Sequence, residues 1–202
     1  MPSARRFLAL GDSYTVGEGV PPEAAWPAVV AARLRSAGVD VAAPEIVAVT
    51  GWTTDELDAG IDAAAPAPPF DLVTLLVGVN DQYRERGAEA YRAPYRALLH
   101  RAARFAEGDP SRVVCVSIPD WGCTAFGARD ARGPEAIARE IDRFNVIARE
   151  EAKRAGAAWA DVTELSRAQG PLTVADDLHP DAKAYAAWAD VIEPVARRAL
   201  GR

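Results

Sequence analysis

One serine and one histidine, far apart in the chain, have the residue types that nucleophilic chemistry needs. Ser13 follows an apolar run in Gly11-Asp12-Ser13-Tyr14, and His179, one of only 2 histidines, lies in Asp176-Asp177-Leu178-His179-Pro180. A serine hydroxyl is a weak nucleophile at neutral pH, so it needs a base within hydrogen-bond distance, and the base needs an orienting partner. His179 and Asp176 have the types and the spacing to be that base and that partner.

Each segment also has an ordinary structural interpretation. A serine after a strand is most often a turn residue or a helix N-cap, and Asp-x-x-His by itself most often marks a capped helix start. The positions of the two segments favour chemistry. One ends the first predicted strand, the other lies in the last loop, and two more polar segments end strands between them.

Short apolar runs alternate with helical patterns along the chain. The runs are rich in β-branched residues and predict buried parallel strands at residues 7–10, 46–49, 72–79, 113–118 and, more weakly, 157–162. Apolar residues at helical spacing predict helices at residues 24–37, 54–64, 88–107, 134–155 and 181–200. We therefore predict an α/β fold with one domain over residues 1–202, a three-layer α/β/α sandwich with a central, mainly five-stranded parallel sheet.

Local capping signals support these helix boundaries. Thr53 and Glu56 have the spacing of a capping box, and Gly38 and Gly156 are positioned to end helices. Pro180 is expected in the first turn of the last helix.

The polar residues of the chain collect where such a sheet binds ligands, outside the carboxyl ends of its strands. Gly11-Asp12-Ser13 follows the first predicted strand, Gly51 follows the second and Asn80-Asp81 follows the third, while His179 lies in the last loop. The fold should gather these segments at one edge of the sheet.

The composition argues against several classes of function. The 202 residues have a net charge of -6 and a pI near 5.0, whereas a nucleic-acid-binding protein needs a surplus of Lys and Arg on one face. No apolar run approaches the ~20 residues that span a bilayer, and the apolar run at residues 7–10 is too short for a signal peptide, so we predict a cytoplasmic protein without a membrane span. The sequence has no phosphate-binding glycine loop and no cluster of His or Cys, so no nucleotide, metal or other cofactor is expected. Cys115 is predicted to be a buried small hydrophobe, and its pairing with Cys123 is the less favoured alternative.

Four ordered segments resemble the sequence blocks of the GDSL, or SGNH, hydrolase family, and the resemblance spans nearly the whole chain. The segments are residues 8–14, 49–52, 78–81 and 176–180. Tyr14 stands where the family name has leucine, a change that should affect packing or the pocket wall rather than the chemistry. The chain lacks the Gly-x-Ser-x-Gly elbow, which disfavours the larger α/β-hydrolase family.

The resemblance implies the flavodoxin-like SGNH fold, with Ser13 as nucleophile, His179 as general base and then acid, and Asp176 as the residue that orients the imidazole. It also implies an oxyanion hole formed by the backbone amides of Ser13 and Gly51 and by the side-chain amide of Asn80. The local chemistry agrees, because a carboxylate three positions before a histidine can accept its Nδ1 hydrogen and leave Nε2 facing the serine.

Other polar residues near these segments are predicted to be structural. Asp12 should shape the turn by accepting backbone hydrogen bonds, and Asp177 and Asp181 should cap a helix or face solvent. His100 lies in a predicted helix with no carboxylate near it in sequence, so it should be structural or solvent-facing.

Aromatic residues near the same edge are candidates for the substrate wall. They are Trp52, Tyr83, Trp121 and Phe126. They suit an acyl chain or an apolar alcohol, although aromatic loop residues often cover the edge of a core instead. The compact chain leaves no evident segment for a large lid, which favours an open cleft and short to medium acyl groups.

The resemblance implies a hydrolase of small-molecule carboxylic esters that acts through an acyl-serine intermediate. The same blocks occur in thioesterases, lysophospholipases and carbohydrate or small-metabolite O-acetylesterases, and acyl transfer is open if a bound alcohol outcompetes water. The alternative outside enzymes is a binding protein of the same fold with an unused triad. Such a protein should lack at least one of the five site residues, and this chain has them all. The sequence does not indicate the oligomeric state.

Overall fold

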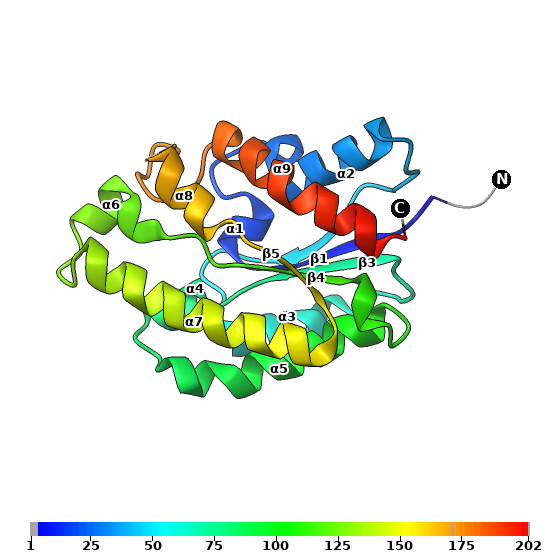
Figure 1. Cartoon of the computed structure of the whole chain (residues 1–202), viewed down its shortest axis with the longest axis horizontal. Helices are drawn as coiled ribbons and strands as arrows, with labels where there is room; N and C mark the ends of the chain where they lie inside the picture. Colours follow the sequence, from blue (N-terminus) through cyan, green and yellow to red (C-terminus); the bar gives the residue numbers. More distant parts are fainter. Residues whose placement is uncertain (1–3, 171, 202) are drawn as a thin grey trace.

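Five parallel strands form the centre of the protein, as Figure 1 shows for the computed structural model, which describes residues 4–170 and 172–201. The strands are β1 (Phe7–Gly11), β2 (Glu45–Ala48), β3 (Leu72–Leu76), β4 (Val113–Val116) and β5 (Ala158–Ala160), in the order β2-β1-β3-β4-β5. All residues of the three central strands are buried, whereas the edge strands β2 and β5 are partly exposed. Fully buried strands are typical of a parallel sheet with both faces covered.

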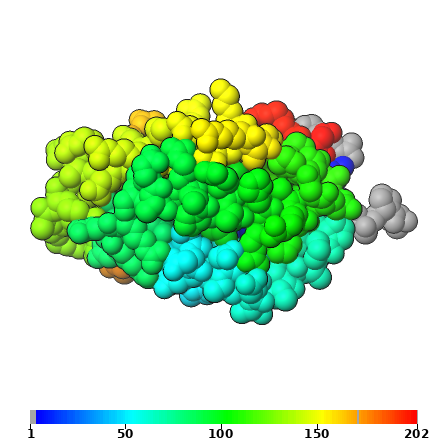
Figure 2. Space-filling view, turned by 90° about the horizontal axis from the view of Figure 1, so that it is seen from below, coloured from blue at the N-terminus to red at the C-terminus, as the bar shows by residue number. Residues whose placement is uncertain are grey.

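Helices cover both faces of the sheet (Figure 1). One face carries α1 (Ser13–Val16), α2 (Trp26–Ser36), α8 (Thr163–Gln169) and α9 (Ala182–Ala199). The other carries α3 (Thr54–Ala64), α4 (Val79–Tyr83), α5 (Ala88–Phe105) and α7 (Pro134–Ala155), and α3, α5 and α7 lie side by side in Figure 2. The short helix α6 (Ala125–Ala128) follows the loop after β4. The predicted three-layer α/β/α fold is confirmed.

The long helices begin and end close to their predicted boundaries. The boundaries of α3 and α7 agree with the prediction, since the capping box of Thr53 and Glu56 starts α3 and Gly156 ends α7 in a left-handed conformation. The prediction that Pro180 lies in the first turn of the last helix was wrong. Asp181 is the N-cap of α9 and accepts the amides of Lys183 and Ala184, so Pro180 lies before the helix.

Three predicted strands are shorter than expected, and the one expected at residues 157–162 is confined to Ala158–Ala160. In the other two, the residues beyond the observed end make different backbone contacts. The strand expected at residues 72–79 ends at Leu76, and Val79 already begins α4. The strand expected at residues 113–118 ends at Val116, and the backbone of Ile118 bonds to the side-chain amide of Asn145 instead.

Single-turn elements escaped the sequence prediction because they are too short to show a periodic pattern. They include α1, α4 and α6, together with 3-10 turns at Pro22–Ala24, Pro110–Arg112 and Trp121–Cys123. Helix α8, with seven residues, was missed for the same reason. Two of these elements, α1 and α4, carry residues of the predicted site.

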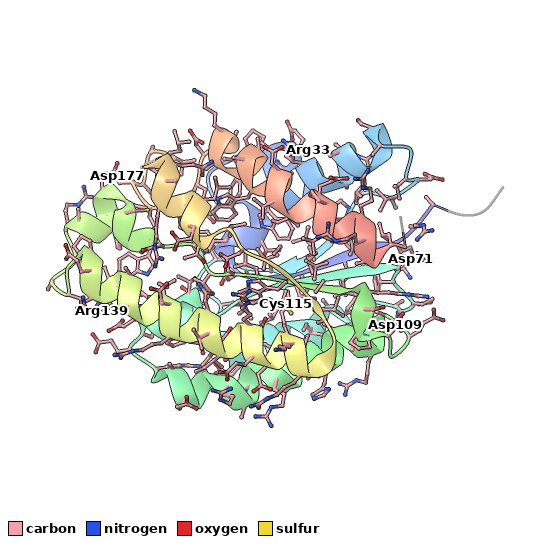
Figure 3. The ribbon with its side chains drawn as sticks, viewed as in Figure 1. Arg33, Asp71, Asp109, Cys115, Arg139 and Asp177 are labelled. Carbon is pink, nitrogen blue, oxygen red and sulfur yellow. The ribbon has the colours of Figure 1, made fainter. Side chains whose placement is uncertain are left out.

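Both cysteines are free, and Cys123 is half-buried. Cys115 is buried in the sheet (Figure 3). Among the residues that the structure describes, no helix has the length and the apolar character to cross a membrane.

Gly78 turns the chain from β3 into α4, and only glycine fits there. Its φ is +127°, and a Cβ would lie 2.7 Å from the ring of Tyr91. We expect Gly78→Ala to lower the free energy of unfolding by roughly 1–3 kcal/mol from backbone strain, with a further loss from the clash. The measurement is urea unfolding.

Gly87→Ser is the matched control, because Gly87 has a negative φ at an N-cap and no atom near a Cβ position. It should change the free energy of unfolding by less than about 0.5 kcal/mol. Equal stability of the two variants would contradict this account of Gly78.

Candidate active site

The segment after β1 places Ser13 at the first position of α1. Asp12 is the N-cap of this helix, and its Oδ1 accepts the backbone N–H of Tyr14 at 3.1 Å. Ser13 is 4% exposed. The predicted structural role of Asp12, which is to shape this turn, is confirmed.

The loop before α9 holds Asp176 and His179 in direct contact. The Nδ1–H of His179 donates to Oδ2 of Asp176 at 2.6 Å, and Oδ1 of Asp176 accepts the backbone N–H groups of Leu178 and His179 at 2.8 and 2.9 Å. Partial burial raises the pKa of Asp176, but the hydrogen bonds from His179 and from the backbone outweigh it and bring the pKa below its ordinary value. The carboxylate is therefore ionised at neutral pH. It holds the imidazole through Nδ1, so that Nε2 is not bonded to Asp176.

Asp177 has a separate contact. It adopts a φ of +65° and forms an ion pair with Arg129 at 3.1 Å. It lies at the end of the molecule opposite Asp71 and Asp109, which precede β3 and β4 in sequence (Figure 3). The loop with His179 is thus at the carboxyl edge of the sheet, as predicted.

A cavity of about 220 Å³ joins the predicted segments, and we call it the Ser13 cavity. It is lined by Ser13, Tyr14, Thr50, Gly51, Val79, Asn80, Tyr83, Trp121, Phe126, Leu178 and His179. Four of the five predicted site residues therefore meet in one cavity, and the fifth, Asp176, is bonded to His179. A serine, an oriented imidazole and nearby amides form a set that can carry out acyl transfer.

Asp81 ties the loop after β2 to the segment after β3. It is 2% exposed, and its carboxylate accepts the backbone N–H and the hydroxyl of Thr54, both at 2.9 Å. The neighbouring Asn80 donates its Nδ2 to the carbonyl of Trp52 at 2.9 Å. These bonds hold Gly51 and Asn80 on the same side of the Ser13 cavity.

Arg84 fixes the backbone at Gly51, a role that the sequence did not indicate. Its Nη2 donates to the carbonyl of Gly51 at 2.7 Å, and Gly51 adopts a φ of +87°. Among the described residues, the N–H groups of Ser13 and Gly51 have no hydrogen-bond acceptor. Both amides are therefore available to a ligand in the cavity.

The predicted aromatic wall is only partly where it was expected. Tyr83, Trp121 and Phe126 line the Ser13 cavity, but Trp52 does not. The ring of Trp52 packs so closely on α3 that a Cβ at Gly60 would lie 2.1 Å from it. The prediction for Trp52 was wrong because its aromatic character does not show which way the ring points.

Arg132, also missed from the sequence, stacks on the wall from outside. Its guanidinium carbon lies 5.1 Å from the ring centroid of Trp121 and 5.5 Å from that of Tyr83. His100 is exposed on α5 and lines a separate surface pocket. Within residues 4–170 and 172–201, no group of three or more His, Cys, Asp or Glu side chains is arranged to hold a metal ion.

The sequence model of the GDSL-like lipase/acylhydrolase family matches residues 9–187. No curated protein sequence matches the chain closely enough to count as a relative. Among solved structures, TesA is similar with a TM-score of 0.75 and 20% identity, covering 96% of this chain and 99% of TesA. The psychrotrophic esterase EstA from Pseudoalteromonas sp. has a TM-score of 0.69 at 18% identity, over 98% of this chain and 100% of EstA. An acetyl-xylooligosaccharide esterase from Geobacillus Stearmophilus has the same score and identity, over 99% of this chain and 95% of that esterase. At these identities the structures establish the fold.

Asp12 is the most perturbed carboxyl beside the site. Burial, with a contribution from the nearby charge of Asp81, raises the pKa of Asp12 from 3.8 to about 8, and its Oδ2 has no hydrogen-bond partner among the described residues. The folded protein therefore binds a proton at Asp12 that the unfolded chain releases between pH 3.8 and about 8. The contribution of Asp12 to stability must fall as the pH rises through this window.

We expect Asp12→Asn to gain stability relative to the wild type between pH 5 and pH 7, by up to about 1.4 kcal/mol per pH unit. The asparagine keeps an oxygen for the Tyr14 amide but does not titrate. Urea unfolding of both proteins across this range measures the difference, and Asp40→Asn, at an exposed side chain, should follow the wild type. If the free energies of unfolding of Asp12→Asn and the wild type changed in parallel with pH, Asp12 would not be a buried neutral acid.

Proposed function

Because this chain belongs to the GDSL-like lipase/acylhydrolase family, we propose that it hydrolyses carboxylic esters with short to medium acyl chains through an acyl-serine intermediate. The observation that carries the proposal is that the Ser13 cavity is lined by both Ser13 and His179, whose Nδ1 lies 2.6 Å from Asp176 Oδ2. This arrangement supplies a nucleophile, a base and an orienting carboxylate.

In the proposed reaction, Oγ of Ser13 attacks the ester carbonyl carbon and gives its proton to Nε2 of His179. Asp176 accepts the Nδ1–H bond and stabilises the imidazolium. The tetrahedral intermediate then collapses, and the alcohol leaves with the proton from His179. A water molecule, deprotonated by His179, attacks the acyl-serine and releases the carboxylic acid, which restores Ser13.

The negative charge on the carbonyl oxygen needs preorganised donors. We propose the backbone amides of Ser13 and Gly51 and the side-chain amide of Asn80. One hydrogen of Asn80 Nδ2 is held by the carbonyl of Trp52, which leaves the second for the substrate oxygen. Arg84, by holding the carbonyl of Gly51, is proposed to keep the Gly51 amide in position.

The lining of the Ser13 cavity supports an apolar acyl group. Beyond the polar residues, the wall consists of Tyr14, Val79, Tyr83, Trp121, Phe126 and Leu178. The volume of the Ser13 cavity, about 220 Å³, lies below the usual range of ~300–1,000 Å³ for sites that bind drug-sized ligands. This volume favours short to medium acyl chains.

Two single substitutions test the proposed machinery. We expect Ser13→Ala and His179→Ala each to lower kcat by at least about 10³-fold on a series of p-nitrophenyl esters. The chain provides a matched control, because His100→Ala changes the only other histidine and should stay within about two-fold of the wild type. Turnover that survives Ser13→Ala in the pure protein would refute the proposal, while Ser13-dependent cleavage of acetylated sugars alone would identify an O-acetylesterase.

Asn80→Ala should lower kcat by about 10²–10³-fold, because it removes one oxyanion donor. Asn145→Ala is the control, since Asn145 bonds the backbone of Ile118 and does not line the Ser13 cavity. It should lower the melting temperature but leave kcat within about two-fold. Equal effects of the two variants on kcat would show that Asn80 acts only through stability.

A further inference from the structure

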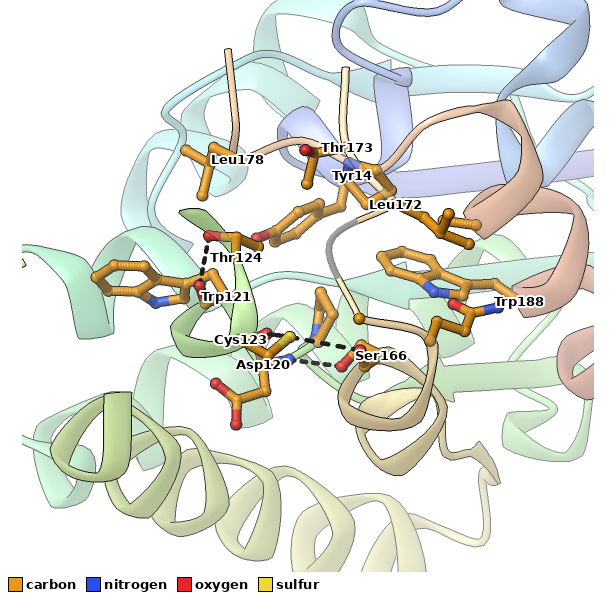
Figure 4. Close-up of a pocket in the computed structure, with 15 residues that line it drawn as sticks. Tyr14, Asp120, Trp121, Cys123, Thr124, Ser166, Leu172, Thr173, Leu178 and Trp188 are labelled. Carbon is orange, nitrogen blue, oxygen red and sulfur yellow. Dashed lines mark hydrogen bonds between the residues drawn. The ribbon is translucent and has the colours of Figure 1, made fainter. Parts of the chain in front are cut away.

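A second, smaller cavity lies behind Tyr14, and Figure 4 shows the residues that line it. We call it the Trp188 cavity. Its volume is about 30 Å³, and its walls come from α1, the loop after β4, α8, the loop between α8 and α9, and α9. Three residues line both this cavity and the Ser13 cavity, namely Tyr14, Trp121 and Leu178.

The ring of Tyr14 separates the two cavities. It makes an edge contact with the imidazole of His179 and another with the indole of Trp188, each with a centroid distance of 5.9 Å. His179 lines only the Ser13 cavity and Trp188 lines only the second one. Because Tyr14 directly follows Ser13 in the chain, this partition stands next to the proposed nucleophile.

The wall of the Trp188 cavity is mainly apolar. Apolar side chains of its wall include Pro119, Pro180, Ala184 and Trp188. Polar side chains also line it, and two of them, Thr124 and Ser166, are hydrogen-bonded within the protein. Thr124 donates its hydroxyl to the carbonyl of Trp121, as Figure 4 shows. Ser166 donates its hydroxyl to the carbonyl of Thr163. The hydrogens of these two hydroxyls are therefore not available to a ligand. Gln169, Thr173 and the Nε1–H of Trp188, which has no hydrogen-bond partner among the described residues, add polar groups to the wall. The wall is nevertheless mainly apolar and suits methylene groups.

We infer that Tyr14 sets the longest acyl chain that the protein accepts, by closing the Ser13 cavity off from an apolar subsite in the Trp188 cavity. The inference rests on the proposed ester hydrolysis and adds its specificity determinant. With Tyr14 in place, the cavity of about 30 Å³ has room for water but not for the end of a longer acyl chain. Removal of the ring joins the two cavities and gives the end of a longer acyl chain an apolar place to bind.

The experiment compares kcat/KM for p-nitrophenyl octanoate and butyrate in the wild type, Tyr14→Phe, Tyr14→Leu and Tyr14→Ala. Each methylene that enters an apolar site gains about four-fold, equivalent to ~0.8 kcal/mol. The octanoate-to-butyrate ratio should therefore rise by at least about 10-fold in Tyr14→Ala and by less in Tyr14→Leu. Tyr14→Phe keeps the ring and should leave the ratio within about two-fold of the wild type. If Tyr14→Ala does not fold, as judged by circular dichroism, Tyr14→Leu carries the test.

A second change refills the new space. Ala184 lines only the Trp188 cavity, so Ala184→Leu added to the folded Tyr14 variant should return the ratio toward the wild-type value. An unchanged octanoate-to-butyrate ratio in folded, active Tyr14→Ala or Tyr14→Leu would overturn the inference about Tyr14 but leave the proposed function standing. An equal shift in Tyr14→Phe would also overturn this inference. Absence of Ser13-dependent ester turnover in the wild type would overturn the proposed function and this inference together.

Discussion

The parallel pairing of β1 with β3 is the constraint on which the rest of the site depends. The two strands are neighbours in the sheet although β2 lies between them in sequence, so the segments that follow them leave the same edge. Ligand sites of open parallel sheets form where the strand order reverses in this way. Ser13 and Asn80 follow these two strands directly. Asp81 holds the segment after β2 in place through its hydrogen bonds to Thr54. The loop before α9 adds His179 to the site.

Burial next to the site controls charge as well as geometry. Asp12 is fully buried, and with a pKa raised to about 8 it is mainly neutral at pH 7, so it adds no full negative charge beside Ser13. Asp176 is different, because its hydrogen bonds lower its pKa and keep it ionised next to His179. The two carboxyls beside the site thus differ in charge, because Asp12 is mainly neutral and Asp176 is negative. That difference suits a reaction in which positive charge forms on the imidazole and negative charge forms near the amides.

The regular parts of the fold could be predicted from the sequence, because α3 and α7 carry clear periodic patterns and the central strands are uninterrupted apolar runs. The residues that meet at the carboxyl edge followed from strand order and the family resemblance. Single helical turns could not be predicted, since their conformation depends on contacts such as that of Gly78 with Tyr91. The direction in which a side chain points could not be predicted either. Trp52 turned out to pack on α3, and the double contact of Tyr14 depends on α9, which is remote in sequence.

The central claim is that His179 activates the hydroxyl of Ser13, and covalent labelling tests it most directly. A fluorophosphonate reacts with an activated serine but not with an ordinary one. The native protein should gain one label per chain, peptide mass spectrometry should map it to Ser13, and His179→Ala should remain unlabelled. Absence of the label from Ser13 in the native protein, or labelling that is equally fast without His179, would contradict the claim and favour a binding protein that shares the fold.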